Sequence, residues 1–184
     1  MAALGDLSRF REAFYQRLTV RADGLFELAD AVLCADGPVT SLVELSLEPE
    51  HRRGHGSLYD SPNQGRIDIG RFRNVMARQS IPRGDGGRIV LGIDVSHWLR
   101  PDANTSPERL FCHTCARGKG QAQMIPGRPY SLVAALERGR SSWTAMLDVQ
   151  QVRPADDHTD LAATQLRAVI DARCRDRRDR RRPR

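Results

Sequence analysis

The chain has 184 residues and a formal net charge of +6 at pH 7, a length that suits one ordinary domain, or a small domain and part of a second. It has no apolar run of about 18 residues or more, and its N-terminus carries charges where a secretion signal would be apolar. The composition therefore argues against a membrane or secreted protein and predicts a cytoplasmic one.

The first 80 residues show helical patterns. Apolar residues recur at helical spacing in three stretches: Leu7, Phe10, Phe14 and Leu18; Leu25, Leu28, Ala29, Val32 and Leu33; and Ile69, Phe72, Val75 and Met76. Between them, Asp36, Gly37 and Pro38 predict a helix end and a new start, which gives a short helix over 39–47. A polar stretch over 51–65 is expected to be irregular. We predict a helical domain over 1–80.

Two of these helices could form a helix-turn-helix, which would make the first domain DNA-binding. The proposed second helix, VTSLVELSL, has no Arg or Lys to offer a major groove. A plain helical bundle is therefore the preferred interpretation, and a helix-turn-helix-like arrangement stays open.

Residues 81–87, IPRGDGG, predict a hinge by their composition. Beyond the hinge the pattern changes to strands and one helix, expected over 88–96, 110–116, 131–136 and 142–149 for the strands, and over 156–172 for the helix. The last two strands are joined by a short turn with a glycine, which suits a hairpin. A helix in this place would normally cross over to a parallel strand, and none follows. The fold class predicted is α+β, with an unfinished α/β domain over 88–172.

Asp94 is the most informative single residue, because it interrupts the apolar run Ile89 to Ile93 and Val95. Burying a carboxylate is costly unless it binds a metal or accepts several hydrogen bonds. The alternative is that Asp94 ends the strand and caps a turn.

The motif Cys112-His113-Thr114-Cys115 could be a redox pair or half of a zinc site. A structural zinc needs four ligands, and no second pair follows. A redox pair should begin a helix, whereas the flanking residues predict a strand and a turn. Incidental, reduced core thiols are the preferred interpretation, and a CxxC oxidoreductase is the least favoured function.

The glycine turn around Lys119 is basic and could approach a phosphate backbone, although it lacks the spacing of a nucleotide-binding loop. Lys119, Arg117 and Arg128 are the candidate DNA-binding residues. Residues 173–184 hold eight Arg and two Asp, which accounts for the whole net charge. Such a segment would bind polyanions in a salt-dependent way. The segment starts abruptly after an amphipathic helix. We therefore predict a disordered tail that results from translation in another reading frame.

Two segments, DVSHWLRPDANTSPER over 94–109 and MIPGRPYS over 124–131, closely resemble the N-terminal half of actinobacterial insertion-sequence transposases. These enzymes have a DDE-type, RNase H-like catalytic domain, and the resemblance covers roughly residues 5–172. It implies that 88–172 is the first half of an RNase H-like domain, with Asp94 as the first catalytic acid and as a ligand of Mg²⁺ or Mn²⁺ in a two-metal site.

The sequence also departs from the pattern of this family. Its second and third acids lie beyond the crossover helix, and the chain ends before both; the acids Asp148, Asp156, Asp157 and Asp160 come too early to replace them. We therefore expect a truncated or frame-shifted transposase fragment that is catalytically inactive alone. The partners implied are the terminal inverted repeats of the element and a transposase multimer, with a nucleoid location. The alternative is a non-catalytic, DNA-binding regulator of an intact transposase.

Overall fold

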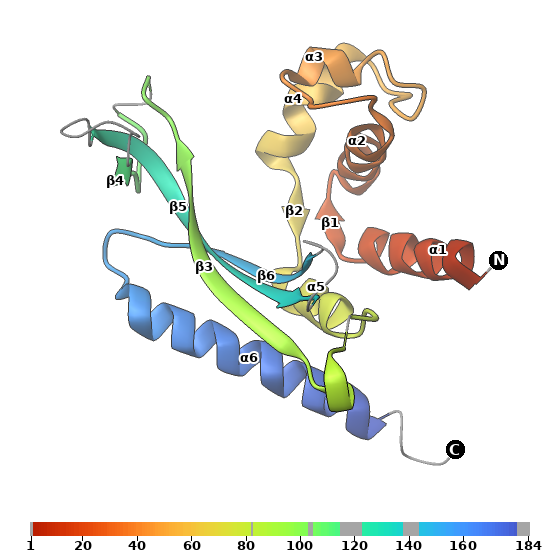
Figure 1. Cartoon of the computed structure of the whole chain (residues 1–184). Helices are drawn as coiled ribbons and strands as arrows, with labels where there is room; N and C mark the ends of the chain where they lie inside the picture. Colours follow the sequence, from red (N-terminus) through yellow and green to blue (C-terminus); the bar gives the residue numbers. More distant parts are fainter. Residues whose placement is uncertain (1, 82, 103–104, 115–122, 138–143, 180–184) are drawn as a thin grey trace. The chain divides into compact units, whose positions relative to one another are not determined.

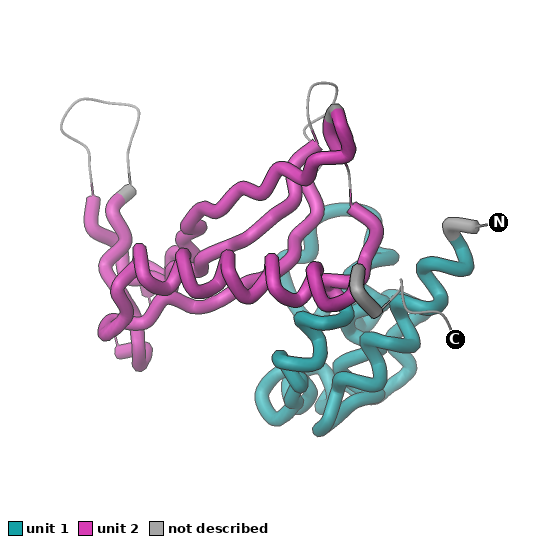
Figure 2. The backbone as a smooth tube through the Cα atoms, turned by 90° about the horizontal axis from the view of Figure 1, so that it is seen from below, with its two compact units in different colours: residues 1–75 teal, residues 76–184 magenta. Residues whose placement is uncertain are grey.

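The computed structural model describes residues 2–81, 83–102, 105–114, 123–137 and 144–179. The helices and strands follow one another along the chain in this order (Figure 1): α1 Ala2–Tyr15, β1 Leu18–Val20, α2 Ala22–Cys34, α3 Leu42–Leu45, α4 His55–Gln64, β2 Arg66–Ile67, α5 Ile69–Ala77, a 3-10 turn Asp85–Gly87, β3 Val90–Leu99, β4 Leu110–Thr114, β5 Gln123–Leu136, β6 Thr144–Gln151 and α6 His158–Asp179. The chain divides into two compact units, residues 1–75 and 76–184 (Figure 2). Helices and antiparallel sheets in these proportions make a mixed α+β structure.

Unit 1 is built on α2, α3 and α4, which share a small core of Leu28, Ala31, Leu45 and Leu58. Its short ladder pairs β1 with β2, and Leu18 opposes Ile67 there. The helical spacing that included Leu18 is therefore wrong at its last member, because α1 ends at Tyr15 and the chain turns into a strand.

Two further elements of unit 1 differ from the prediction. Helix α3 is shorter than 39–47 and begins after Ser41, whose hydroxyl accepts from the Glu44 backbone N–H while the Glu44 carboxylate accepts from the Ser41 N–H. This capping box places the helix start at Ser41, whereas Asp36 and Pro38 had predicted a start at residue 39. Helix α4 forms in the polar stretch over 51–65 and buries only Leu58 and Ser61, so its sequence carries little apolar periodicity.

Unit 2 contains a twisted antiparallel sheet with the long strand β5 at its centre. Strand β3 pairs with one edge of β5 from Val90 opposite Leu136 to Leu99 opposite Gly127. Strands β4 and β6 pair with successive parts of the other edge. The predicted hairpin of the last two strands is present as β5 and β6; its turn, 138–143, lies outside the described residues.

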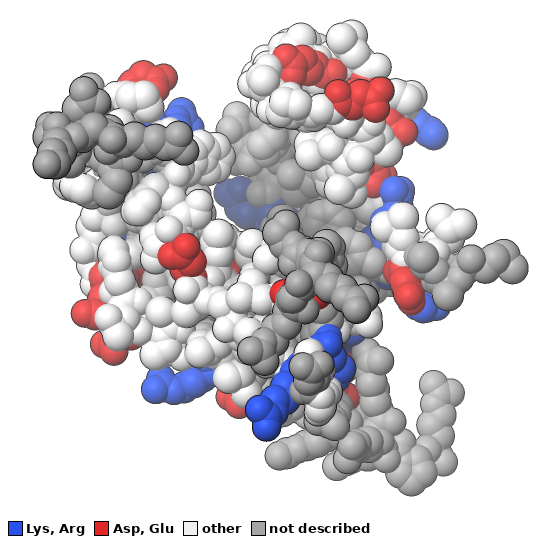
Figure 3. Space-filling view, in the orientation of Figure 1, with Lys and Arg blue, Asp and Glu red and all other residues white. Residues whose placement is uncertain are grey.

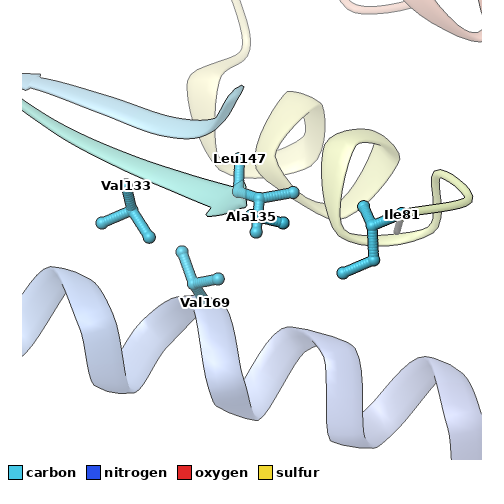
Figure 4. Close-up of a cluster of buried hydrophobic side chains, with 5 residues drawn as sticks. All are labelled: Ile81, Val133, Ala135, Leu147 and Val169. Carbon is cyan, nitrogen blue, oxygen red and sulfur yellow. The ribbon is translucent and has the colours of Figure 1, made fainter. Parts of the chain in front are cut away.

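Helix α6 covers one face of this sheet and packs over β5 and β6. The core between helix and sheet contains Val133 and Ala135 of β5, Leu147 of β6, Val169 of α6 and Ile81 (Figure 4). Two buried polar side chains join the layers in addition to these apolar contacts. Ser131 Oγ donates to Gln165 Oε1 at 2.7 Å, and Gln165 Nε2 donates to the Ser131 carbonyl at 3.1 Å.

Helix α6 continues to Asp179, past the end expected at 172. Arg173 Nη1 donates to the Ala77 carbonyl at 2.8 Å, and Asp176 pairs with Arg78 at 3.5 Å. The structure thus has 173–179 as helix, which suits the high helix propensity of Arg, whereas a disordered, out-of-frame tail had been expected from 173; that expectation stays a prediction. Residues 180–184 lie outside the described part of the chain.

Candidate functional site

Asp94 lies in the middle of β3, opposite Leu132 of β5. Its side chain is exposed, and Oδ1 accepts a hydrogen bond of 2.8 Å from the Val95 N–H. Strand β3 runs five residues further to Leu99, so Asp94 does not end the strand as a turn cap. The apolar run around Asp94 suggested burial; the carboxylate is instead accessible to water and to a ligand.

Opposed residues of an antiparallel pair share one face of a sheet, so the register defines which positions accompany Asp94. We call this the open face, because α6 packs on the other side, where Ser131, Val133 and Ala135 are buried. Its positions are Val90, Gly92, Asp94, Ser96 and Trp98 of β3; Met124, Pro126, Arg128, Tyr130, Leu132, Ala134 and Leu136 of β5; Phe111 and His113 of β4; and Thr144, Met146, Val149 and Gln151 of β6. In Figure 3 the region that β3 occupies carries mostly uncharged side chains.

Among the described strand positions of the open face, Asp94 is the single acid. Asp148, the first of the four later aspartates considered above, opposes Val133 and is buried on the side that faces α6, where Gln150 Nε2 donates to its Oδ2 at 3.2 Å. The sheet therefore separates the Asp94 and Asp148 carboxylates.

Two of the other acids have local structural roles at the start of α6. Asp157 Oδ1 accepts from the backbone N–H groups of Asp160 and Thr159, and these bonds hold its pKa below the ordinary value. Asp156 accepts from the Arg153 N–H at 2.8 Å. The described residues contain no group of three or more His, Cys, Asp or Glu side chains placed to hold a metal ion. A divalent ion needs more protein ligands or substrate oxygens than Asp94 supplies, so these residues alone do not fit one.

Of the three predicted DNA-binding residues, the structure describes Arg128 alone. Lys119 and Arg117 lie outside the described residues. Arg128 lies in β5 opposite Trp98, and its Nη2 donates to Ser106 Oγ at 3.0 Å and to the Pro107 carbonyl at 3.3 Å. Arg128 therefore fixes the segment that precedes β4, and a contact between Arg128 and DNA stays a prediction.

Of the two cysteines in the motif, Cys112 is among the described residues and Cys115 lies outside them. Cys112 is buried in β4, and burial raises the pKa of its thiol. A reactive cysteine needs a lowered pKa. Cys112 thus has the properties of an inert core thiol.

Unit 1 contains a cavity of about 440 Å³ beside the start of α4, lined in part by Arg21, Arg53 and His55. Both arginines have partners: Arg21 Nη2 donates to Gln64 Oε1 at 2.9 Å, and Arg53 pairs with Asp23 at 2.9 Å and with Glu27. The charge of Arg53 is thus balanced by Asp23 and Glu27, and the lining also contains the acid Asp60.

Sequence reasoning missed the aromatic residues of the open face. Trp98 lies beyond the strand predicted over 88–96, but the structure includes it in β3, where it is 60% exposed. Its ring centroid is 6.3 Å from that of Tyr130. The signal was available in the alternation of Asp94, Ser96 and Trp98, which places all three on one side of a longer strand.

No described helix is long and apolar enough to cross a membrane. No curated protein and no solved structure matches the chain significantly. A family model for the DDE superfamily endonucleases matches residues 13–183, which covers unit 1 from residue 13 onward and nearly all of unit 2 with its Arg-rich segment. A match over this much of the chain shows the family: the protein belongs to the DDE superfamily endonucleases.

Proposed function

We propose that the chain is a transposase-type DDE endonuclease polypeptide and that Asp94 is its first catalytic acid. The observation that carries this proposal is the position of Asp94, alone among acids at the described positions of the open face, in the middle of the strand that forms one edge of the described sheet. A carboxylate there can reach a bound nucleic acid, whereas Asp148 under α6 cannot. Family membership makes DNA the substrate class.

DDE superfamily nucleases typically use divalent metal ions, which activate the attacking oxygen and stabilise the leaving oxygen. The residues described here offer Asp94 alone on the relevant face, so we infer that the chain does not cleave DNA by itself. Further acids would have to come from a longer or a second polypeptide. The proposed organisation is a helical domain over 1–80, for which DNA binding stays an open alternative, and the first half of an RNase H-like domain over 88–172.

A nicking assay on supercoiled plasmid tests this proposal. The purified chain and its Asp94→Asn variant are incubated with Mg²⁺ or Mn²⁺, and the relaxed product is quantified. We expect the same background from both proteins, because a single carboxylate cannot hold the metal ions that the reaction needs. Cleavage that depends on Asp94 would show that the chain carries a complete site and would refute its inactivity.

A second candidate function is that of a DNA-binding regulator, which would occupy the terminal inverted repeats of an element or join multimers of an intact transposase. It is favoured by the separate compactness of unit 1, which has its own core and its own sheet ladder. Selection of bound sequences from a random duplex library, with the full chain as bait, distinguishes the two. Enrichment of one sequence that survives raised salt supports a regulator, and only salt-sensitive, unselective binding supports a relic of the enzyme. A nucleoid location would follow from either form of binding.

A further inference from the structure

The open face of unit 2 carries three aromatic side chains from three different strands. Trp98 of β3 and Phe111 of β4 are 60% and 58% exposed, and Tyr130 of β5 is partly exposed. Aromatic side chains bury large areas when they have partners, and on this face a ligand can reach the rings of Trp98 and Phe111.

The register places the three rings around Arg128. Trp98 is directly opposite Arg128, so their Cβ atoms lie about 5 Å apart. Tyr130 follows Arg128 by two positions on the same face of β5, and its ring contacts that of Trp98. Phe111 opposes Pro126, two positions before Arg128, on the other edge of β5. The rings of Trp98 and Phe111 are therefore held on either side of β5, roughly 10 Å apart across the sheet.

Hydrogen bonds order the backbone next to the aromatic residues. Arg128 Nη2 fixes the Ser106–Pro107 segment next to β4, and the Arg100 N–H donates to the Pro126 carbonyl at 2.7 Å where β3 ends. A rigid sheet with ordered neighbours positions rings better than a loop does.

Asp94 lies on this same face. It is four residues from Trp98 along β3, which corresponds to roughly 13 Å, or about four stacked nucleotides at ~3.4 Å each. It is two positions from Ser96, the residue opposite Tyr130. A strand of nucleic acid that stacked on the rings could therefore extend to the Asp94 carboxylate.

We propose that Trp98, Tyr130 and Phe111 form a stacking platform for the unpaired bases of a DNA strand, which they hold beside Asp94. Successive bases stack on exposed aromatic rings of a sheet with little regard to sequence. This inference rests on the proposed function for the choice of DNA, because the family acts on DNA and Asp94 shares the face. The platform binds unpaired DNA better than duplex, since paired bases do not expose their ring faces.

The test measures binding of the full chain to a labelled single-stranded oligonucleotide and to a duplex of the same sequence, by fluorescence anisotropy. The variants are Trp98→Ala, Phe111→Ala and the conservative Trp98→Phe, with Val149→Ala as the matched control, because Val149 is an exposed apolar residue of the same face on β6. We expect Trp98→Ala and Phe111→Ala each to weaken single-strand binding about 5- to 150-fold, the range that stacking of one base supplies. Trp98→Phe should retain most of the affinity, and Val149→Ala should bind like the unaltered chain.

A second measurement covers the case in which Trp98→Ala does not fold. In a Trp143→Phe background the fluorescence of Trp98 alone is followed during titration with the single-stranded oligonucleotide, and stacking predicts quenching that saturates with the binding curve. Equal binding of single strand and duplex, with no quenching, would overturn the platform and leave the proposed function standing. Binding of neither DNA would overturn both. A loss of self-association in Trp98→Ala, with DNA binding unchanged, would make the face a protein interface and overturn the platform.

Discussion

Asp94 shows how a single residue can be identified from sequence while its surroundings cannot. Its position in an apolar run marked it as unusual, but that run was taken as buried on both sides. The structure exposes it, because α6 covers one face of the sheet and the described part of unit 2 places no helix on the other. Which face a helix covers depends on packing between distant segments, and local periodicity does not report it.

The buried pair of Ser131 and Gln165 was not predictable, because 34 residues separate its members. The variant Ser131→Ala removes the hydroxyl that donates to Gln165 Oε1 and leaves this oxygen buried without its donor. We expect the free energy of unfolding to fall by about 1–3 kcal/mol, measured by urea denaturation of the full chain. Ser96→Ala, on the exposed side of β3, is the control and should change it by less than about 0.5 kcal/mol; equal effects would contradict the role of the pair.

Asp157 gives α6 a pH dependence. Backbone N–H groups of Asp160 and Thr159 hold its pKa below the ordinary value of 3.8. Its stabilising effect is therefore complete above that ordinary value and is lost as the pH falls through the lowered, folded-state pKa. The variant Asp157→Asn keeps a capping oxygen but does not titrate. The difference in urea midpoint between the two proteins should be constant near neutral pH and should change only below the ordinary pKa; a change near neutral pH would refute this assignment.

Among the helices and strands, those with a long apolar pattern were predicted from the sequence, and those with a short or weak pattern were missed. The strands β3, β5 and β6 and the helices α2, α5 and α6 follow from long apolar patterns, although their ends shift by several residues. Helix α4 was missed because one apolar side chain, Leu58, and Ser61 supply its buried surface. The short ladder of β1 and β2 joins residues 18 and 67, and neither strand is long enough to show an alternation.

The last turns of α6 test whether the Arg-rich segment belongs to the fold. Arg173→Met keeps the apolar stem of the side chain but removes the hydrogen bonds to the carbonyl groups of Ala77 and Gln79. We expect a loss of about 1.5–3 kcal/mol in the free energy of unfolding, because the donor is charged. Arg175→Met, at an exposed position of the same turn, is the matched control. If Arg173→Met lowered the free energy of unfolding no more than Arg175→Met, the Arg173 hydrogen bonds would not contribute to the stability of unit 2.

At the scale of the whole molecule, the sequence predicted two parts with different secondary structure, and the chain has two compact units. The division falls at residue 75, inside the last helix of the first part, because the end of α5 contacts α6 through Ala77. Two short motifs around β3 and β5 indicated a DDE-type enzyme, and the match over 13–183 confirms the DDE superfamily; the actinobacterial origin stays a prediction. The open face required the register of four strands, which motifs alone do not supply.

The central proposal is that Asp94 is one acid of a DDE site, and that the described residues of the chain do not complete it with the further acids needed to hold a metal ion. Titration of the full chain with Mn²⁺, followed by calorimetry and by the electron paramagnetic resonance of the free ion, tests it most directly. The account predicts no saturable site that distinguishes the unaltered chain from Asp94→Asn, because one exposed carboxylate binds the ion no better than other surface acids. A stoichiometric site that disappears in Asp94→Asn would contradict the account and would mean that the chain assembles its own metal centre.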